Sequence, residues 1–167
     1  SPAETLGHLV RLRGDAVLLC NTFGSDLEAL AEPEDANLDR LGPGAVVELA
    51  DGRAVGSLAA ATLKSDLVVD AVFGTGFQGS PMGLSGTVIG QMNACGRPIL
   101  AVDVPSGLNA TTGAAEGECV RATWTCTMGF PKRGFYISPG RELVGEVHVV
   151  DIGIPQRAVE AVGVRDN

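Results

Sequence analysis

The chain has 167 residues, of which 45% are apolar and 19% are charged, as is typical of a single soluble globular domain. A formal net charge of -8 without a basic cluster argues against a nucleic-acid partner, because binding to phosphate backbones depends on clustered Lys and Arg. No apolar run approaches the roughly 20 residues that span a bilayer, and no signal-peptide pattern opens the chain. The four cysteines have no C-x-x-C spacing, so we expect reduced core thiols and a cytoplasmic location.

Apolar patterning predicts alternating strands and helices along the chain. Strands are predicted at 15–20, 45–49, 66–70, 97–103, 123–129 and 145–153. Helices are predicted at 3–14, 24–42 (two short helices split at Pro33), 52–63 and 84–95, with a long loop at 130–144. Alternation of this kind, with continuous apolar strands, predicts an α/β fold whose parallel sheet is covered on both faces.

The stretch "VVDAVFGTGFQGSPMG" places Gly74, Gly76 and Gly79 in the order G-x-G-x-x-G after a predicted strand. A dinucleotide-binding fingerprint would follow its strand directly and carry its third glycine inside a helix. Here other residues intervene and Pro81 follows the last glycine, so this interpretation is not favoured. The glycines still allow backbone N–H groups to approach an anion closely. The alternative is a plain flexible connection.

Two aspartates end predicted strands, Asp70 in "LVVD" and Asp103 in "ILAVD". Ligands of open parallel sheets bind beyond the carboxyl ends of the strands, so neighbouring strands would bring both carboxylates to one crevice. Pro105 stiffens the turn after Asp103, and a carboxylate held in this way can transfer protons; alternatively it only accepts hydrogen bonds from loop amides. Asp70 is either a loop cap, a cation ligand or an acceptor from a ligand hydroxyl. Ser106 is either a turn residue or a cation ligand.

Four segments, "SDLVVDAVFGTGFQG", "RPILAVDVPSGLNATTG", "MGFPKRG" and "GEVHVVDIGIP", resemble the NAD(P)H-hydrate epimerase family in this order, over about residues 45–155. The resemblance implies a three-layer α/β/α Rossmann-like fold with a mostly parallel sheet. It also implies a metabolite-repair isomerase that interconverts the R and S forms of hydrated NADH and NADPH. A homodimer and a fused or separate ADP- or ATP-dependent dehydratase are further implications.

The resemblance also implies roles for individual residues. Asp103 is expected to be the catalytic acid/base and to contact the substrate, and Asp70 and Ser106 are expected to help bind a potassium ion. Lys132 matches a recurrent lysine, for which we expect a solvated side chain or, at most, a phosphate contact. The expected nucleotide-binding residues are Gly74, Thr75, Gly76, Phe77, Gln78, Gly79 and Ser80.

One family element has no match, an N-terminal loop of the form "NNGGDG" that binds substrate phosphates. We therefore expect residues 1–167 to be a single epimerase-type domain lacking its N-terminal strand and phosphate loop. The alternative function is a catalytically silent nucleotide-binding or interaction module. A hydrolase triad of Ser106, His148 and an aspartate is not favoured, because no G-x-S-x-G motif is present. His8 is expected to be a surface or boundary residue.

Overall fold

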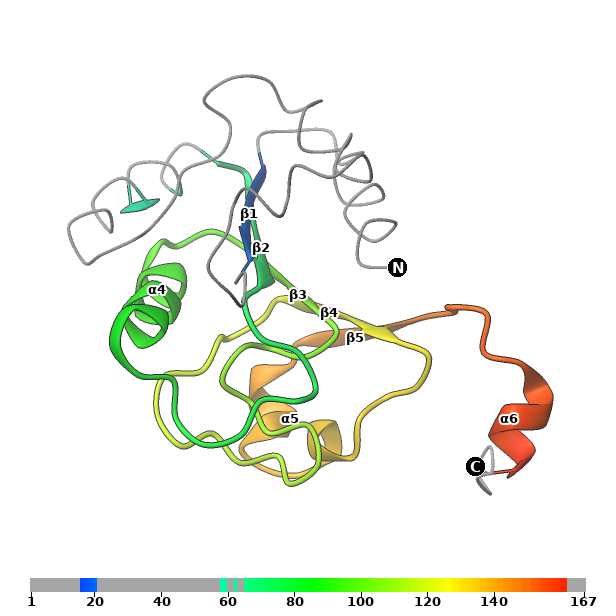
Figure 1. Ribbon diagram of the computed structural model, residues 1–167. Coiled ribbons are helices and arrows are strands. Elements are labelled where there is room, and N and C mark those ends of the chain that lie inside the picture. The colour runs from blue at the N-terminus through cyan, green and yellow to red at the C-terminus, as the bar shows by residue number, and fades with distance from the viewer. Residues whose placement is uncertain (1–15, 21–57, 60–61, 63–64, 162–167) are drawn as a thin grey trace, which may run out of the picture.

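A parallel sheet organises the protein, seen in a computed structural model that describes residues 16–20, 58–59, 62 and 65–161 (Figure 1). Its strands are β1 (Ala16–Cys20), β2 (Leu67–Ala71), β3 (Ile99–Val102), β4 (Trp124–Met128) and β5 (Glu146–Val150). They lie in the order β1-β2-β3-β4-β5, and each neighbouring pair is parallel. The predicted α/β class with a parallel sheet is confirmed.

The described helices are α4 (Gly83–Ala94), the short 3₁₀ helix η3 (Arg133–Tyr136), α5 (Gly140–Leu143) and α6 (Gln156–Ala161). The predicted strands at 15–20, 66–70, 97–103, 123–129 and 145–153 and the predicted helix at 84–95 are confirmed, with ends that differ by up to three residues. Of the predicted helix at 52–63, the described residues Leu58, Ala59 and Thr62 are helical. The predicted elements at 3–14, 24–42 and 45–49 lie outside the described residues. None of the described helices is long and apolar enough to cross a membrane.

The prediction of a continuous loop over 130–144 is wrong, because this segment contains η3 and α5. Tertiary contacts rather than local propensity form these short helices. Gly134 N–H donates to Ala110 O at 2.7 Å, and Gly140 N–H donates to Gly113 O at 3.0 Å. Contacts between segments distant in sequence produce no periodic pattern of apolar residues, so the sequence did not predict these two helices. Helix α6 was likewise not predicted, and it lies apart from the sheet (Figure 1).

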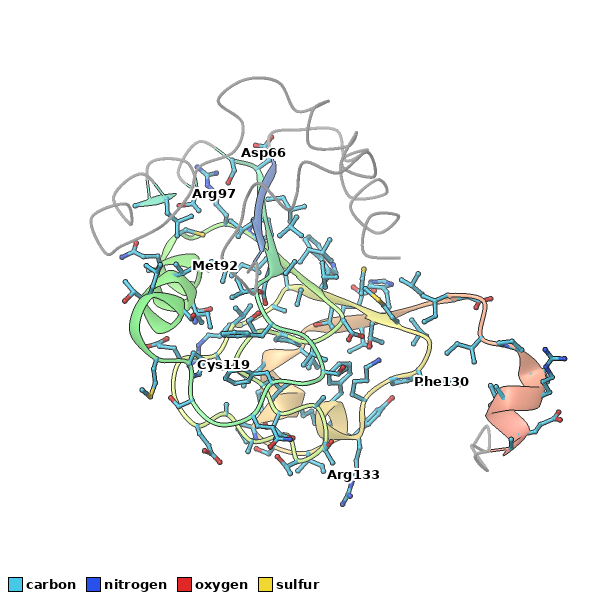
Figure 2. All side chains as sticks on the ribbon, in the orientation of Figure 1. Asp66, Met92, Arg97, Cys119, Phe130 and Arg133 are labelled. Atoms are coloured by element: carbon cyan, nitrogen blue, oxygen red, sulfur yellow. The ribbon has the colours of Figure 1, made fainter. Side chains whose placement is uncertain are left out.

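Helix α4 packs on one face of the sheet through Val88, Ile89 and Met92, which are buried against Val68 and Ile99. Figure 2 labels Met92, whose side chain lies between α4 and the strands. Because Val68 and Asp70 of β2 alternate onto the same face, the side chain of Asp70 points into this covered layer.

Helix α5 lies on the same side of the sheet. Thr125 Oγ1 of β4 donates to Val144 O, directly after α5, at 2.7 Å, and Leu143 and Val144 belong to a second buried cluster with Val104 and Leu108. The opposite face of the sheet, where a second helical layer is expected, is not covered by α4 or α5.

The cysteines that the structure describes with side chains, Cys95, Cys119 and Cys126, are free thiols. Burial raises the pKa of Cys119 to about 12 and also raises the pKa of Cys126. Burial therefore favours the protonated thiol at Cys119 and Cys126, and the three free thiols agree with the prediction of reduced cysteines.

Gly107, directly after Ser106, has a φ of +96°, and a Cβ at this position would collide with Glu118 O and lie 2.9 Å from Cys119 Cα. We expect Gly107→Ala to lower the free energy of unfolding by about 3 kcal/mol, because backbone strain and a steric clash add together. Thermal denaturation should show a fall in Tm of roughly 6–12 °C. Gly74→Ala is the matched control, since Gly74 has no left-handed φ and a Cβ there meets nothing within 4 Å. Equal melting temperatures for the two variants would contradict this packing argument.

Candidate active site

The two predicted aspartates lie at the carboxyl ends of neighbouring strands. Asp70 is in β2 and Asp103 directly follows β3, and these strands pair with each other. The expectation that the strands are neighbours is confirmed. Within the described contacts, however, no hydrogen bond joins the two aspartates. Asp70 bonds to Ser106, whereas Asp103 bonds to the end of β4 and to Lys132.

The Asp70 carboxylate is fully buried and bonded to the loop after β3. Its Oδ1 accepts hydrogen bonds from Ser106 Oγ at 2.6 Å and Val72 N at 3.3 Å, and its Oδ2 accepts one from Ser106 N at 2.8 Å. Ser106 Oγ in turn accepts a bond from Phe73 N at 2.8 Å. Burial raises the pKa of Asp70 from 3.8 to about 6, and the bonds from Ser106 and Val72 oppose that rise. Asp70 therefore joins β2, the start of the glycine loop and the turn after β3.

The donor set around Asp70 fits an alkali cation such as the expected potassium ion. Asp70 and Ser106 offer only oxygen, which hard cations prefer. Among the described residues, only Ser106 N–H donates to Asp70 Oδ2, which leaves a second lone pair for a cation. A buried carboxylate also needs a compensating charge to remain ionised. No cluster of three or more His, Cys, Asp or Glu side chains suited to a metal ion occurs in the part of the chain that the structure describes. The ligand roles of Asp70 and Ser106 stay a prediction.

Asp103 is the central residue of a tight turn that ends β3. Its φ is +68°, and Val104 N–H donates to Val102 O at 2.9 Å, which together define a γ-turn. Asp and Asn adopt a left-handed φ more readily than other non-glycine residues. Because Asp103 N–H also donates to Cys126 O of β4 at 2.8 Å, the turn is fixed against the neighbouring strand.

The two carboxylate oxygens of Asp103 have different surroundings. Oδ1 accepts hydrogen bonds from Met128 N at 3.1 Å and Thr127 Oγ1 at 3.4 Å, and it lies 3.0 Å from Lys132 Nζ. Among the described residues, none donates a hydrogen bond to Oδ2. The side chain is 17% exposed. One oxygen is therefore fixed by the protein, whereas the other has no donor among the described residues.

The expectation of a solvated Lys132 is wrong. Besides its ion pair with Asp103, Lys132 Nζ donates to Met128 O at 2.8 Å and to Phe130 O at 3.0 Å, and its side chain is only 17% exposed. One feature of the sequence could have predicted this contact. If β3 and β4 are parallel neighbours, a lysine shortly after β4 lies close to the residue that follows β3, which is Asp103. Strand order, which the sequence pattern did not determine, decides this placement.

The glycine loop from Gly74 to Ser80 is exposed except for the half-buried Phe77. Phe77 N–H donates to Gly74 O at 3.1 Å, and its ring stacks on that of Phe73 with centroids 4.4 Å apart, so the loop has internal contacts. Gly79 has a φ of +83°, whereas Gly74 and Gly76 have no left-handed φ and a Cβ at either would meet nothing within 4 Å. The fold itself does not require glycine at 74 and 76, which fits a backbone surface left open for a ligand.

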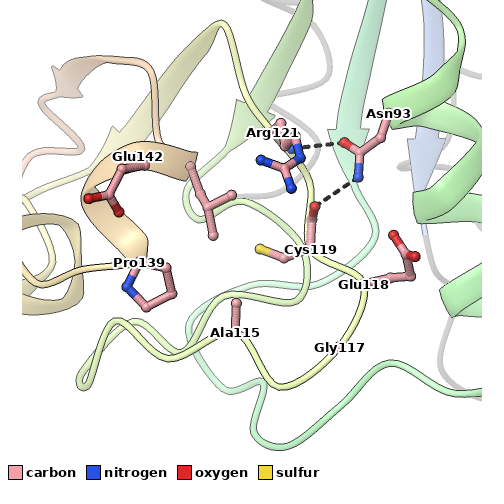
Figure 3. A pocket seen from close by; sticks show the side chains of 9 residues that line it. Asn93, Ala115, Gly117, Glu118, Cys119, Arg121, Pro139 and Glu142 are labelled. Atoms are coloured by element: carbon pink, nitrogen blue, oxygen red, sulfur yellow. Dashed lines mark hydrogen bonds between the residues drawn. The ribbon is translucent and has the colours of Figure 1, made fainter.

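A separate pocket of about 470 Å³ lies between α4, the β3–β4 connection and α5 (Figure 3). The Asn93 amide closes one side of it, since Nδ2 donates to Cys119 O and Oδ1 accepts from Arg121 N, each at 2.9 Å. The lining residues include none of the predicted site residues: Asn93, Ala115, Gly117, Glu118, Cys119, Arg121, Pro139, Glu142 and Leu143.

The hydrolase interpretation is excluded by the positions of its residues. Ser106 is buried and bonded to Asp70, whereas the exposed His148 of β5 lies 3.2 Å from Glu146. His8 lies outside the described residues. No serine–histidine pair is formed in the region that the structure describes.

The parallel sheet with α4 and α5 packed on it defines a Rossmann-like α/β domain, and Asp70 and Asp103 lie at the carboxyl ends of its strands. The crystal structure of yeast ynu0 (YNL200c) has the same fold, with a TM-score of 0.70 and 16% sequence identity over 97% of this chain and 79% of the yeast chain. Residues 16–134 match the family described as YjeF-related protein N-terminus, and the chain belongs to this family.

Individual relatives agree with this membership. The chain is 54% identical over 99 residues to the bifunctional NAD(P)H-hydrate repair enzyme Nnr of Moorella thermoacetica, covering 59% of this chain and 19% of that protein. It is 31% identical over 157 residues to the NAD(P)H-hydrate epimerase of Pirellula staleyi, covering 93% of this chain and 68% of that protein. The chain spans 48% of the NAD(P)H-hydrate epimerase of Dehalogenimonas lykanthroporepellens, with 36% identity over 121 residues. It is thus much shorter than several of its relatives.

The buried Asp70 makes stability depend on pH. Because its pKa of about 6 in the folded protein exceeds the ordinary value of 3.8, the folded state holds this proton more tightly than the unfolded state does. The stabilisation is complete below pH 4 and is lost as pH rises through 6. We expect the free energy of unfolding to fall by about 3 kcal/mol more between pH 4 and 7 than in Asp70→Asn. Urea denaturation in potassium-free buffer measures this difference.

The matched control is Asp66→Asn, because Asp66 is exposed and lies directly before the same strand. This control should follow the pH dependence of the parent protein. Parallel pH profiles for the parent and Asp70→Asn would show that Asp70 does not carry the effect.

Proposed function

We propose that this chain is an isomerase that interconverts the R and S forms of hydrated NADH and NADPH, with Asp103 as the catalytic acid/base. The names of the relatives, NAD(P)H-hydrate epimerase and repair enzyme, support the substrate class. The observation that carries the proposal is the Asp103 carboxylate. It is fixed through Oδ1 and receives no hydrogen bond at Oδ2 from a described residue, and it lies at the edge of the sheet where ligands of such folds bind.

The chemistry requires one proton to be delivered and recovered near one carbon. Epimerisation of the hydrated nicotinamide carbon proceeds either by loss and return of the hydroxyl or by ring opening. On either route, a protonated Asp103 Oδ2 donates to the departing oxygen or to the ring, and the carboxylate then takes the proton back. A positioned group of this kind contributes roughly 100- to 10,000-fold in rate.

The glycine loop, residues 74–80, is proposed to bind the nucleotide. Its exposed backbone offers N–H groups to phosphate oxygens. A protein with a net charge of -8 needs such local donors to bind a phosphate, because its overall charge repels anions. The open space around Gly74 and Gly76 supports close approach of a ligand.

Asp70 and Ser106 are proposed to hold a potassium ion. Its positive charge would compensate the buried Asp70 carboxylate. These two residues also bond to each other, to Phe73 at the start of the glycine loop and to the turn that carries Asp103. Ion binding at Asp70 would therefore hold both loops in their binding arrangement.

Further features of the whole protein are proposed on the same basis. We expect a homodimer, a cytoplasmic location in keeping with the free thiols, and cooperation with an ADP- or ATP-dependent dehydratase, either fused or separate. The bifunctional relatives support the fused arrangement.

The test of the acid/base role is Asp103→Asn. Asn tolerates the left-handed backbone but cannot exchange a proton, so we expect epimerisation to fall roughly 100- to 10,000-fold with an unchanged fold. R-enriched hydrated NADPH is the substrate, and an S-specific dehydratase reports the product, with potassium varied. A parent chain that is folded but gives no conversion above background would overturn the proposal and favour a silent binding module.

The test of the nucleotide loop is Gly76→Val. A Cβ at this position meets no other described residue within 4 Å, so we expect the Tm not to change, whereas the valine side chain fills space proposed for the substrate. We expect KM to rise by about tenfold or more, which corresponds to about 1.4 kcal/mol of binding free energy. The control is Thr111→Val, an exposed change in another loop. An unaltered KM in Gly76→Val would contradict substrate binding at this loop.

A further inference from the structure

Lys132 has three oxygen atoms around its ammonium group. Nζ lies 3.0 Å from Asp103 Oδ1, 2.8 Å from Met128 O and 3.0 Å from Phe130 O. An ammonium has three N–H donors, so all of them are used within the protein. Lys132 therefore has no donor left for a substrate phosphate.

The same contacts hold Asp103 Oδ1 in place. Met128 donates its N–H to Asp103 Oδ1 and accepts from Lys132 through its carbonyl oxygen. Phe130 N–H also donates to Met128 O at 2.8 Å across Gly129, which has a φ of +71°, so the segment after β4 forms its own γ-turn. Removing the ammonium would leave Met128 O and Phe130 O without this donor and Oδ1 without its positive neighbour.

We propose that Lys132 is a positioning residue for the reaction: it fixes Asp103 Oδ1 and thereby makes Oδ2 the atom that exchanges the proton with the substrate. This inference rests on the proposed acid/base role of Asp103. Without the ammonium, only Met128 N–H and the longer bond from Thr127 Oγ1 hold Oδ1, so the carboxylate rotates more easily about χ2 and its two oxygens can exchange. An oxygen that leaves its productive position by about 1 Å loses on the order of 100-fold in rate.

The neighbouring residue supplies a matched control. Arg133 directly follows Lys132, is exposed, and points away from the body of the protein (Figure 2). Lys132→Met and Arg133→Met each remove one positive charge and keep an apolar stem, so long-range electrostatic effects are similar. Only the first removes the contact with Asp103.

The experiment measures kcat and KM separately for the parent, Lys132→Met, Arg133→Met, Asp103→Asn and the Lys132→Met/Asp103→Asn double variant of the full chain. We expect Lys132→Met to lower kcat roughly 10- to 100-fold with KM within threefold, and Arg133→Met to match the parent. Because Lys132 acts through Asp103, the double variant should be no slower than Asp103→Asn alone. A raised KM with unchanged kcat, or additive losses in the double variant, would overturn the proposal.

A second measurement does not depend on activity. In nuclear magnetic resonance spectra, hydrogen exchange at the Met128 amide reports its bond to Asp103 Oδ1. We expect faster exchange in Lys132→Met and no change in Arg133→Met; equal protection in both would overturn the proposal. If Lys132→Met does not fold, Lys132→Gln serves, because it keeps two N–H donors without the charge. Should the parent chain prove inactive, the proposed function fails while the exchange data still decide the positioning role.

Discussion

The hydrogen bonds between Asp70 and Ser106 hold together the parts of the site. Asp70 is buried in a strand, and Ser106 lies three residues after Asp103, so their bonds fix the turn beyond β3 relative to β2. Ser106 also accepts a bond from Phe73, where the glycine loop begins. A buried carboxylate is costly unless its hydrogen bonds are made, so these bonds hold the loop and the turn in one arrangement.

The strand ends beyond β3 and β4 carry a second, more exposed cluster. Asp103 and Gly129 each occupy the centre of a γ-turn with a left-handed φ, so both chains turn sharply at the same edge of the sheet. Asp70 is shielded from solvent, whereas Asp103 remains partly exposed. This difference in burial is consistent with the two proposed roles, a cation-binding carboxylate at Asp70 and a proton-transferring one at Asp103.

The sequence predicted the described strands, α4 and the positions of both aspartates, because strand periodicity and short motifs are local properties. It did not predict η3 or α5, whose formation depends on hydrogen bonds to the carbonyl oxygens of Ala110 and Gly113. It also did not predict the partly buried environment of Lys132. Both depend on which segments become neighbours in space. The family resemblance assigned Asp70 and Ser106 to one cation site and so implied that they lie close together. Their hydrogen bond itself depends on the pairing of β2 with β3.

The left-handed turn at Asp103 narrows the sequences that this position can accept. Glycine, asparagine and aspartate adopt such a backbone most easily, and only aspartate among them can exchange a proton. Replacement of Asp103 by asparagine or glycine would therefore keep the turn and remove the proposed acid/base. If Asp103 acts as proposed, a single substitution at this turn would separate an isomerase from a folded binding protein without that activity.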